Sequence, residues 1–395
     1  MNNNSVSDFN LRRLFYNQEV RSVGIQILTL AVICYLVFSI GQNVLVNLAA
    51  IGKDISFNFL WVPAGYDITF QPFVDYGPTN THFRAAMVGL SNTLLVAVTG
   101  IVLATILGFI LGVMRLSQNF LVSKLSQIFV EFTRNVPVLL HIFFIYGVII
   151  NLLPVPKKAE SIGGVFFLTN RGIFAPAPTL EQGYEAVVGA FIVALIGCYA
   201  LARWAKKRQM KTGQIFPVFL TSLGLIIALP LLANVVVGGA IGVEIPKLKG
   251  FNFKGGLILR PEYVALWFAL SYYTASFIAE IVRGGILAIH KGQKEAAHAL
   301  GIPANRTLRL VVIPQALPLI IPPIASNYLN LTKNSSLAIA IGYFDIVATL
   351  GGISLMQTGK EVETMSLVLL IYLCLSLCIS ASMNFLNHRV TLKAR

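Results

Sequence analysis

Few side chains of this 395-residue chain have the types and spacing that covalent or metal chemistry needs. Cys374 and Cys378 lie one helical turn apart, but no histidine or acid joins them, so we expect both to pack as small hydrophobic side chains. The sequence has no G-x4-G-K-[ST] phosphate-binding loop. Without clustered His, Cys or paired acids, the pattern argues against a membrane enzyme.

One polar island, "KGQKEAAHALGIP" at residues 291–303, separates two long apolar stretches. Its Ala and Leu content favours a helix, and Gly301 and Pro303 are typical of a helix end. A helix of about two turns is marginal alone in water, so something must hold it. Glu295 offers a carboxylate to an Arg or Lys of a partner. From the residues alone, a docking element and an ordinary interfacial connector both stay open.

A second polar cluster, "TKNSS" at residues 332–336, interrupts an apolar stretch from Gln315 to Leu350. As one helix this stretch would be about 54 Å long, against a hydrocarbon core of about 30 Å. We therefore predict a helix broken near this cluster, with a shorter segment after it. Broken helices at membrane depth line cavities, which makes a substrate path a possible role. The candidate path residues are Lys333, Asn334, Ser335 and Ser336.

Three further polar positions have two interpretations each. Lys333 either reaches the outer interface along its aliphatic stem or faces the substrate path. Glu280 and Arg283, three residues apart on an expected helix, form a local ion pair or a gating contact. His141, inside an expected span, is a packing histidine or a proton relay.

The elements that carry these residues are membrane spans. The chain is 56% hydrophobic and 12% charged, with a mean hydropathy of +0.76. Repeated apolar runs of about 18 residues or more indicate a polytopic membrane protein, and helices satisfy the backbone in hydrocarbon. We therefore expect an all-α transmembrane bundle. Its eight predicted spans lie near residues 23–48, 90–114, 135–153, 186–203, 215–238, 263–287, 313–345 and 365–387.

Charge sets the predicted orientation. With both termini inside, cytoplasmic segments hold 19 of the 30 basic residues and five of the 16 acids. The positive-inside rule favours this arrangement, which places residues 291–303 in the cytoplasm. Insertion and anionic lipid explain the net charge of +14, so nucleic-acid binding is not indicated.

The second predicted span carries a small residue at every fourth position, which lets another helix backbone approach closely. This stripe is typical of a compact helical bundle, whatever the function. Its members are Gly100, Ala104, Gly108 and Gly112.

The polar island belongs to a longer pattern. "EAAHALG", nine further residues and "VVIP" resemble the E-A-A-x3-G-x9-I-x-L-P loop of ABC-importer permease subunits, with Val311 and Ile313 as conservative departures. Over roughly 180 residues, the chain also resembles the polar amino-acid uptake branch of that family. The segments that carry this likeness are "GLSNTLLVAV" (89–98), "EFTRNVPVLLHIFF" (131–144), "YYTASFIAEIVRGGILAIHKGQ" (272–293), "PQALPLIIPP" (314–323) and "TKNSSL" (332–337).

The resemblance implies a five-span permease core and identifies the island as a coupling helix that docks on a cytoplasmic ATPase. That partner would bind ATP and Mg, and this chain would be non-catalytic and bind no cofactor. Glu295 would supply the ionic contact, and the family motif with its neighbours would supply shape. Those residues are Gly292, Ala296, Ala297, Leu300 and Gly301.

The chain is longer than compact family members, so we expect three parts. They are residues 1–85 with an extra first span, a permease domain over 86–387 with spans inserted at 154–262, and a tail at 388–395. This length is most like permeases of general L-amino-acid importers of the bacterial inner membrane. That likeness implies a periplasmic amino-acid-binding protein and a second permease chain, with a heterodimer favoured and a homodimer still open.

The rival function is an ion-coupled secondary amino-acid transporter or a channel. Such a carrier normally needs a charged group at mid-depth in a span. Outside the seventh predicted span and the Glu280 region, the spans hold almost none. The resemblance therefore favours an ATP-driven importer.

Overall fold

A computed structural model describes residues 18–390, in two compact units, Met1–Phe59 and Leu60–Arg395. The predicted N-terminal tail up to residue 17 and the last five residues lie outside the described part. The first unit contains one apolar helix, α2 (Gln18–Ala50), with no buried residue. Such a helix needs lipid or another protein around it.

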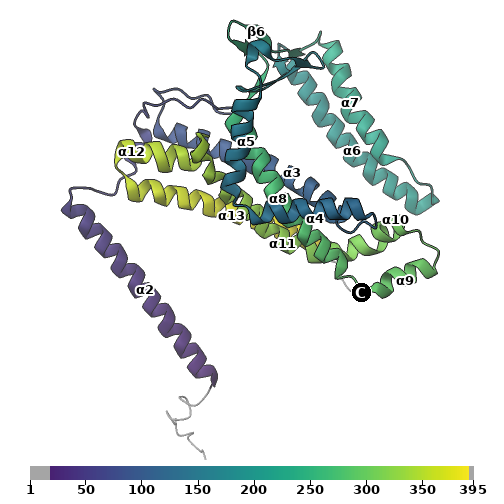
Figure 1. The fold of residues 1–395 in the computed structure, drawn as a ribbon, viewed down its shortest axis with the longest axis horizontal. Coiled ribbons are helices and arrows are strands. Elements are labelled where there is room, and N and C mark those ends of the chain that lie inside the picture. The colour runs from purple at the N-terminus through teal and green to yellow at the C-terminus, as the bar shows by residue number, and fades with distance from the viewer. Residues whose placement is uncertain (1–17, 391–395) are drawn as a thin grey trace, which may run out of the picture. The chain divides into compact units, whose positions relative to one another are not determined.

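Helices dominate the second unit, in agreement with the predicted all-α class (Figure 1). Among residues 18–390, seven helices are long and apolar enough to cross a membrane, and a bent pair gives an eighth span. The α-helices of the second unit are α3 (His82–Met114), α4 (Phe120–Asn135), α5 (Val138–Leu152), α6 (Tyr184–Thr212), α7 (Val218–Val236), α8 (Pro261–Leu287), α9 (Lys291–Ala299), α10 (Ala304–Thr307), α11 (Ile313–Asn334), α12 (Leu355–Thr358) and α13 (Glu361–Val390).

The centre of the bundle is the seam between α3 and α8. A Cβ atom added to Gly108 would lie 2.5 Å from Ile278 Cγ2, and one added to Gly112 would lie 2.8 Å from Val282 Cβ. Ala104 is fully buried. The small-residue stripe thus lies where the two backbones approach most closely, which is how such stripes pack in membranes.

The third predicted span is a bent pair instead of one straight helix. Helices α4 and α5 meet at an angle of 106°. Pro137 explains the bend, because the residue before a proline is driven out of the helical region, and Val136 is extended. With 15 residues, α5 is only about 22 Å long. The elbow therefore places α4 across the direction of α5.

The seventh predicted span changes its helical type at the polar cluster but does not break there as predicted; the break comes at Gly342, because Ala304–Ile341 is one helical span. Helix α11 ends at Asn334 and continues as the 3₁₀ helix η4 (Ser335–Ile341), which ends at Gly342 with φ +77°. Two further helical segments follow, the π-helical η5 (Val347–Ser354) and α12. A second π segment, η3 (Leu308–Val312), precedes α11.

The segment after Gly342 packs back onto α3. Tyr343 Oη donates to the Asn92 carbonyl at 3.0 Å, and the Asn92 amide donates to the Phe344 carbonyl at 2.9 Å. The Ile346 N–H donates to Thr93 Oγ1 at 3.1 Å. These bonds explain how an irregular backbone is accommodated beside a membrane-spanning helix, because its polar groups are satisfied within the protein.

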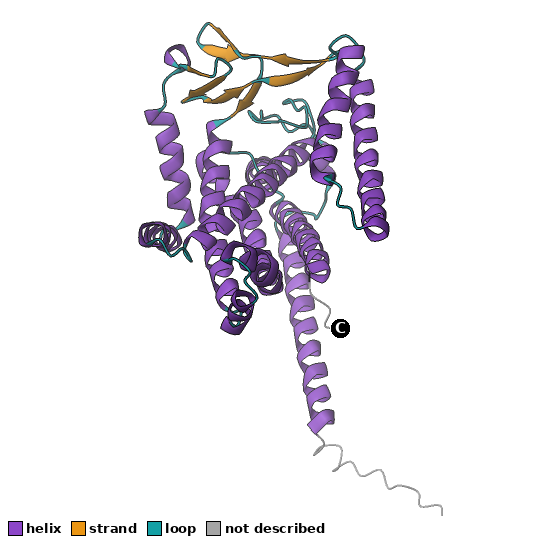
Figure 2. Cartoon of the chain, turned by 90° about the vertical axis from the view of Figure 1, so that its right-hand side faces the viewer, coloured by secondary structure: helices purple, strands orange, loops and turns teal. Residues whose placement is uncertain are grey.

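Eight short strands lie between the end of α5 and the start of α8. They gather at one end of the helices (Figure 2). One sheet has the order β1-β2-β3-β8, and β4–β5 and β6–β7 are separate antiparallel pairs. The strands are β1 (Ser161–Ile162), β2 (Phe166–Thr169), β3 (Gly172–Ala175), β4 (Ala177–Leu180), β5 (Ile241–Glu244), β6 (Lys247–Lys249), β7 (Asn252–Lys254) and β8 (Leu257–Leu259).

We call this layer, residues 154–183 and 240–260, the β cap. Helices α6 and α7 form a hairpin that leaves the cap after β4 and returns to it at β5. Helix α8 starts directly after β8, and its other end leads into α9 (Figure 1). With 27 residues, α8 is about 40 Å long, longer than the hydrocarbon core. The β cap and α9 therefore lie at opposite ends of a span.

The outer segment before α3 belongs to the second unit. Ile68 and Tyr76 are buried together with Ala85 and Val88 of α3. The sequence analysis grouped residues 60–85 with the extra first span, but their apolar side chains pack on the permease core. The division between the two units falls between Phe59 and Leu60.

Candidate functional site: helix α9 and the broken span

Helix α9 has a defined structure at both ends. At its start, the Gly292 N–H donates to His290 Nδ1 at 3.1 Å, so His290 serves as the N-cap. At its end, the Ile302 N–H donates to the Ala297 carbonyl and the Gly301 N–H donates to the His298 carbonyl. Gly301 has φ +70°. This is the Schellman arrangement that glycine favours, and it gives a short helix a fixed length.

The side chains of α9 divide between an inner and an outer face. Ala297 is 4% exposed and faces its own chain, whereas Leu300 is 79% exposed. Glu295 and Ala296 are exposed beside Leu300, and no described residue forms an ion pair with Glu295. The exposed ridge therefore includes His298 and Ala299 together with Glu295, Ala296 and Leu300.

Ala297, which the sequence analysis grouped with the docking surface, has a different position. Its small side chain lies under α9, where a larger one would lift the helix off its own chain. A sequence signal for this existed, because the residue that begins the Schellman arrangement often contacts the apolar residue after the glycine, here Ile302. A larger side chain at Ala297 would therefore disturb the packing of α9 against its own chain, and any effect on docking would follow from that.

Near the end of α8 that leads to α9, an ion cluster joins three helices. Glu280 pairs with Arg283 at 2.7 Å, with Arg115 at the end of α3, and more loosely with Arg134 of α4 at 3.9 Å. The Arg115 side chain is only 9% exposed. Sequence analysis singled out Glu280 and Arg283 but missed the other two arginines as partners, because no local spacing links residues so far apart in the chain.

The candidate path residues do not share one face of the broken span. Lys333 is exposed, whereas Ser335 is fully buried and lies 3.3 Å from Tyr372 Oη of α13. Ser336 Oγ donates to the Lys333 carbonyl at 2.8 Å. Asn334 is half-buried. Lys333 thus points away from the bundle, while Ser335 connects the broken span to the last helix.

Sequence analysis did not single out Asp345, which is fully buried after the broken span. One carboxylate oxygen accepts from the Ala348 N–H at 2.8 Å, and the other accepts from Tyr372 Oη at 3.3 Å. The carboxylate therefore satisfies the first turn of η5 and shares Tyr372 with Ser335. These contacts are structural, so they give the ion-coupled alternative no support.

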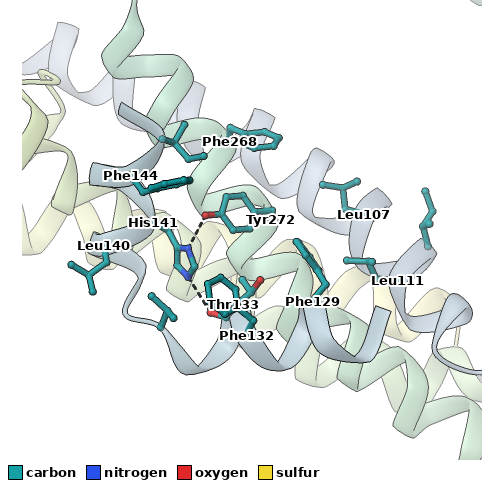
Figure 3. A pocket seen from close by; sticks show the side chains of 13 residues that line it. Leu107, Leu111, Phe129, Phe132, Thr133, Leu140, His141, Phe144, Phe268 and Tyr272 are labelled. Atoms are coloured by element: carbon teal, nitrogen blue, oxygen red, sulfur yellow. Dashed lines mark hydrogen bonds between the residues drawn. The ribbon is translucent and has the colours of Figure 1, made fainter. Parts of the chain in front are cut away.

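An apolar groove of about 760 Å³ lies between α3, α4, α5 and α8 (Figure 3). In it, His141 Nε2 donates to the Thr133 carbonyl at 3.2 Å and Nδ1 accepts from Tyr272 Oη at 2.7 Å. With both ring nitrogens occupied, His141 has the contacts of a packing residue. The surrounding side chains, such as Leu111 and Phe268, are apolar, so the groove offers little to a zwitterion.

The part of the chain that the structure describes holds no group of three His, Cys, Asp or Glu side chains suited to a metal ion. Cys374 and Cys378 are both exposed on α13 and do not lie in the core where we expected them. In a spanning helix this exposure places them toward lipid or another subunit.

Comparison with known proteins gives the family. Residues 104–392 match the family described as "Binding-protein-dependent transport system inner membrane component". The "General L-amino acid transport system permease protein AapQ" of Rhizobium johnstonii is 46% identical, with 98% of this chain and 96% of the relative covered. The "Putative amino-acid ABC transporter permease protein YhdX" of Escherichia coli is 46% identical, with 96% and 97% covered.

A third relative has the same extent. The "Glutamate/glutamine/aspartate/asparagine transport system permease protein BztB" of Rhodobacter capsulatus is 43% identical, with 98% of this chain and 97% of the relative covered. These alignments include the extra first span and the inserted α6–α7 hairpin. The chain is a multi-pass inner-membrane protein and belongs to the family of binding-protein-dependent transport system permeases.

Proposed function

We propose that this chain is the membrane-spanning permease subunit of an ATP-driven importer of L-amino acids, and that a separate ATPase docks on α9. ATP and Mg²⁺ are bound by that ATPase, and this chain is non-catalytic. The observation that carries the proposal is the exposed ridge of α9, where Leu300 is 79% exposed and Glu295 has no ion-pair partner among residues 18–390. A large apolar side chain and a free carboxylate on one short, fixed helix suit a protein partner.

The same geometry gives a route for force. Helix α9 follows α8 after three residues, and α8 packs along α3 through the glycine stripe. The Glu280 cluster fastens α3 and α4 to the same end of α8. A docked ATPase that favours one position of α9 therefore favours one arrangement of these helices. Alternating exposure of the substrate path to the two sides follows from that preference.

The remaining assignments rest on charge and on the relatives. We assign both termini and α9 to the cytoplasm, because 19 of the 30 basic residues then lie on that side. The names of the relatives support L-amino acids as substrates. A second, related permease chain completes the channel, with a heterodimer favoured, and a binding protein delivers the amino acid from outside.

Domain roles and path residues complete the proposal. Residues 86–387 form the permease domain, with the β cap and α6–α7 inserted at 154–262. Lys333, which is exposed on the side away from the bundle, and Asn334 contact the amino acid where the second permease chain completes the channel. Ser335 and Ser336 hold the broken helix in place through their hydrogen bonds.

The test is charge reversal at Glu295. In the assembled transporter, Glu295→Lys should lower ATPase co-purification and amino-acid uptake by about tenfold or more, because the ionic contact becomes repulsive. Glu185→Lys, the same change on an exposed acid at the start of α6, is the control and should leave both unchanged. Normal uptake by the Glu295 variant would contradict the docking role of α9.

A further inference from the structure

The β cap concentrates positive charge on a side of the membrane where the total charge is balanced. Under the proposed topology the outer segments hold 11 basic and 11 acidic residues, and the cap alone holds seven of those basic residues but three of the acids. Positive residues near spans are normally depleted outside, because they oppose insertion. Their concentration on one element therefore calls for a separate cause.

The lysines of the hairpin β6–β7 share one face. Lys247 pairs directly with Lys254 across the hairpin, and Lys249 lies two residues along on the same side. The opposite face carries Phe253, which is buried against Phe167 and Phe174. The three lysines are thus turned away from the cap interior, and all three are exposed.

This arrangement costs free energy in the isolated chain, since like charges placed opposite each other across strands repel. Among the described residues, no carboxylate lies within ion-pair distance of these lysines. The nearby Glu244 lies beside Gly255, the residue after Lys254, without forming an ion pair. An external anionic partner would remove the repulsion.

The tip of the hairpin carries an aromatic anchor. Gly250 has φ +68°, which suits the first central position of a two-residue turn, and Phe251 follows it at 75% exposure. Lys157 Nζ lies 4.0 Å from the centre of the Phe251 ring, and Arg171 donates to the Phe251 carbonyl at 3.2 Å. An exposed aromatic ring held inside a rim of cations is the kind of centre on which protein interfaces are built.

We propose that the β6–β7 hairpin is the docking surface for the solute-binding protein, and that it fits an acidic surface with an apolar recess for Phe251. This rests on the proposed function, because that function places the cap on the outer side. A protein fits better than anionic lipid headgroups, since the cap lies beyond the end of α8, which is itself longer than the hydrocarbon core. The cations should act mainly on the association rate and its salt dependence.

The experiment uses the assembled transporter in nanodiscs, with the purified solute-binding protein as the probe. The combined variant Lys247→Glu, Lys249→Glu, Lys254→Glu should raise the Kd by about tenfold or more at low salt, with a smaller effect at high salt. The neutral triple Lys→Gln variant should change the Kd in the same direction by less. Phe251→Ala should raise the Kd mainly through faster dissociation.

The controls separate this proposal from the proposed function. Lys158→Glu, the same substitution at a single exposed lysine of the cap outside the hairpin, should leave the Kd unchanged, and basal ATPase activity should be the same in every variant. If the Kd of the triple Lys→Glu variant for the solute-binding protein stays within about twofold of the parent's, the hairpin assignment is wrong, while the proposed role in uptake is unaffected. A loss seen only in nanodiscs containing phosphatidylglycerol would also overturn the assignment, because that result identifies lipid as the partner. A parent complex without stimulated uptake would instead contradict the proposed function.

Discussion

The seam between α3 and α8 and the ridge on α9 use small residues for opposite purposes. At the seam, Gly108 and Gly112 allow two backbones of one chain to meet, and nothing is left exposed. On α9, Ala296 is exposed in the ridge that includes Glu295 and Leu300, and no residue within 18–390 covers it. A small residue thus indicates that another backbone approaches closely. Its burial indicates whether that backbone belongs to the same chain or to a partner.

The largest effect should come from filling the seam. Gly108→Val would push into Ile278 and toward the Ala275 carbonyl, which a Cβ would already approach to 3.1 Å. We expect a loss of about 3 kcal/mol or more in folding stability, measured as loss of the folded protein on thermal unfolding in detergent. Gly147→Val on α5 is the matched control, because a Cβ added to Gly147 would meet no atom of the described residues within 4 Å. Equal stability of the two variants would break the comparison.

A smaller effect should come from the ion cluster that joins the two regions. Glu280→Gln removes the carboxylate beside the mostly buried Arg115, which should cost about 1–3 kcal/mol. Glu131→Gln replaces an exposed acid that accepts a hydrogen bond from Gln127, and it should cost little folding stability. Thermal unfolding of both variants checks this, and a harmless Glu280→Gln would show that the cluster does not hold α8.

The smallest effect should come from the end of α9. Gly301→Ala places a Cβ on a residue with φ +70°, at a cost of about 1–2 kcal/mol that falls on α9 alone. Hydrogen exchange of residues 291–301 should become faster, while the unfolding temperature of the bundle stays nearly unchanged. Gly284→Ala, a helical glycine with nothing within 4 Å, should change neither. Slower exchange in the Gly301 variant would contradict the capping role.

Local signals predicted much of this molecule. Apolar run lengths predicted the spans, and the Gly-Pro ending predicted the end of α9. The excess length after Gln315 predicted a break near residues 332–336, whereas the helix only changes type there and ends at Gly342. Each of these rests on residues within a few turns of one another, where propensity, capping and length act directly.

The remaining features depend on contacts between distant segments. Arg115 meets Glu280 across 165 residues, and Asp345 meets Tyr372 on another helix. The bend at Pro137 was readable in principle, but its angle depends on packing against α8. The β cap was missed because its strands are only two to four residues long, which is too short to show an alternating pattern.

The most direct test of the account is a photocrosslink from α9. A photoreactive amino acid at Leu300 in the assembled transporter should crosslink to the ATPase subunit, and the same probe at Phe251 on the β cap should not. We expect ATP to change the yield from position 300, since docking must differ between the two states. Crosslinks to the ATPase from Phe251, or none from Leu300 in an active transporter, would contradict the claim that force enters the bundle through α9.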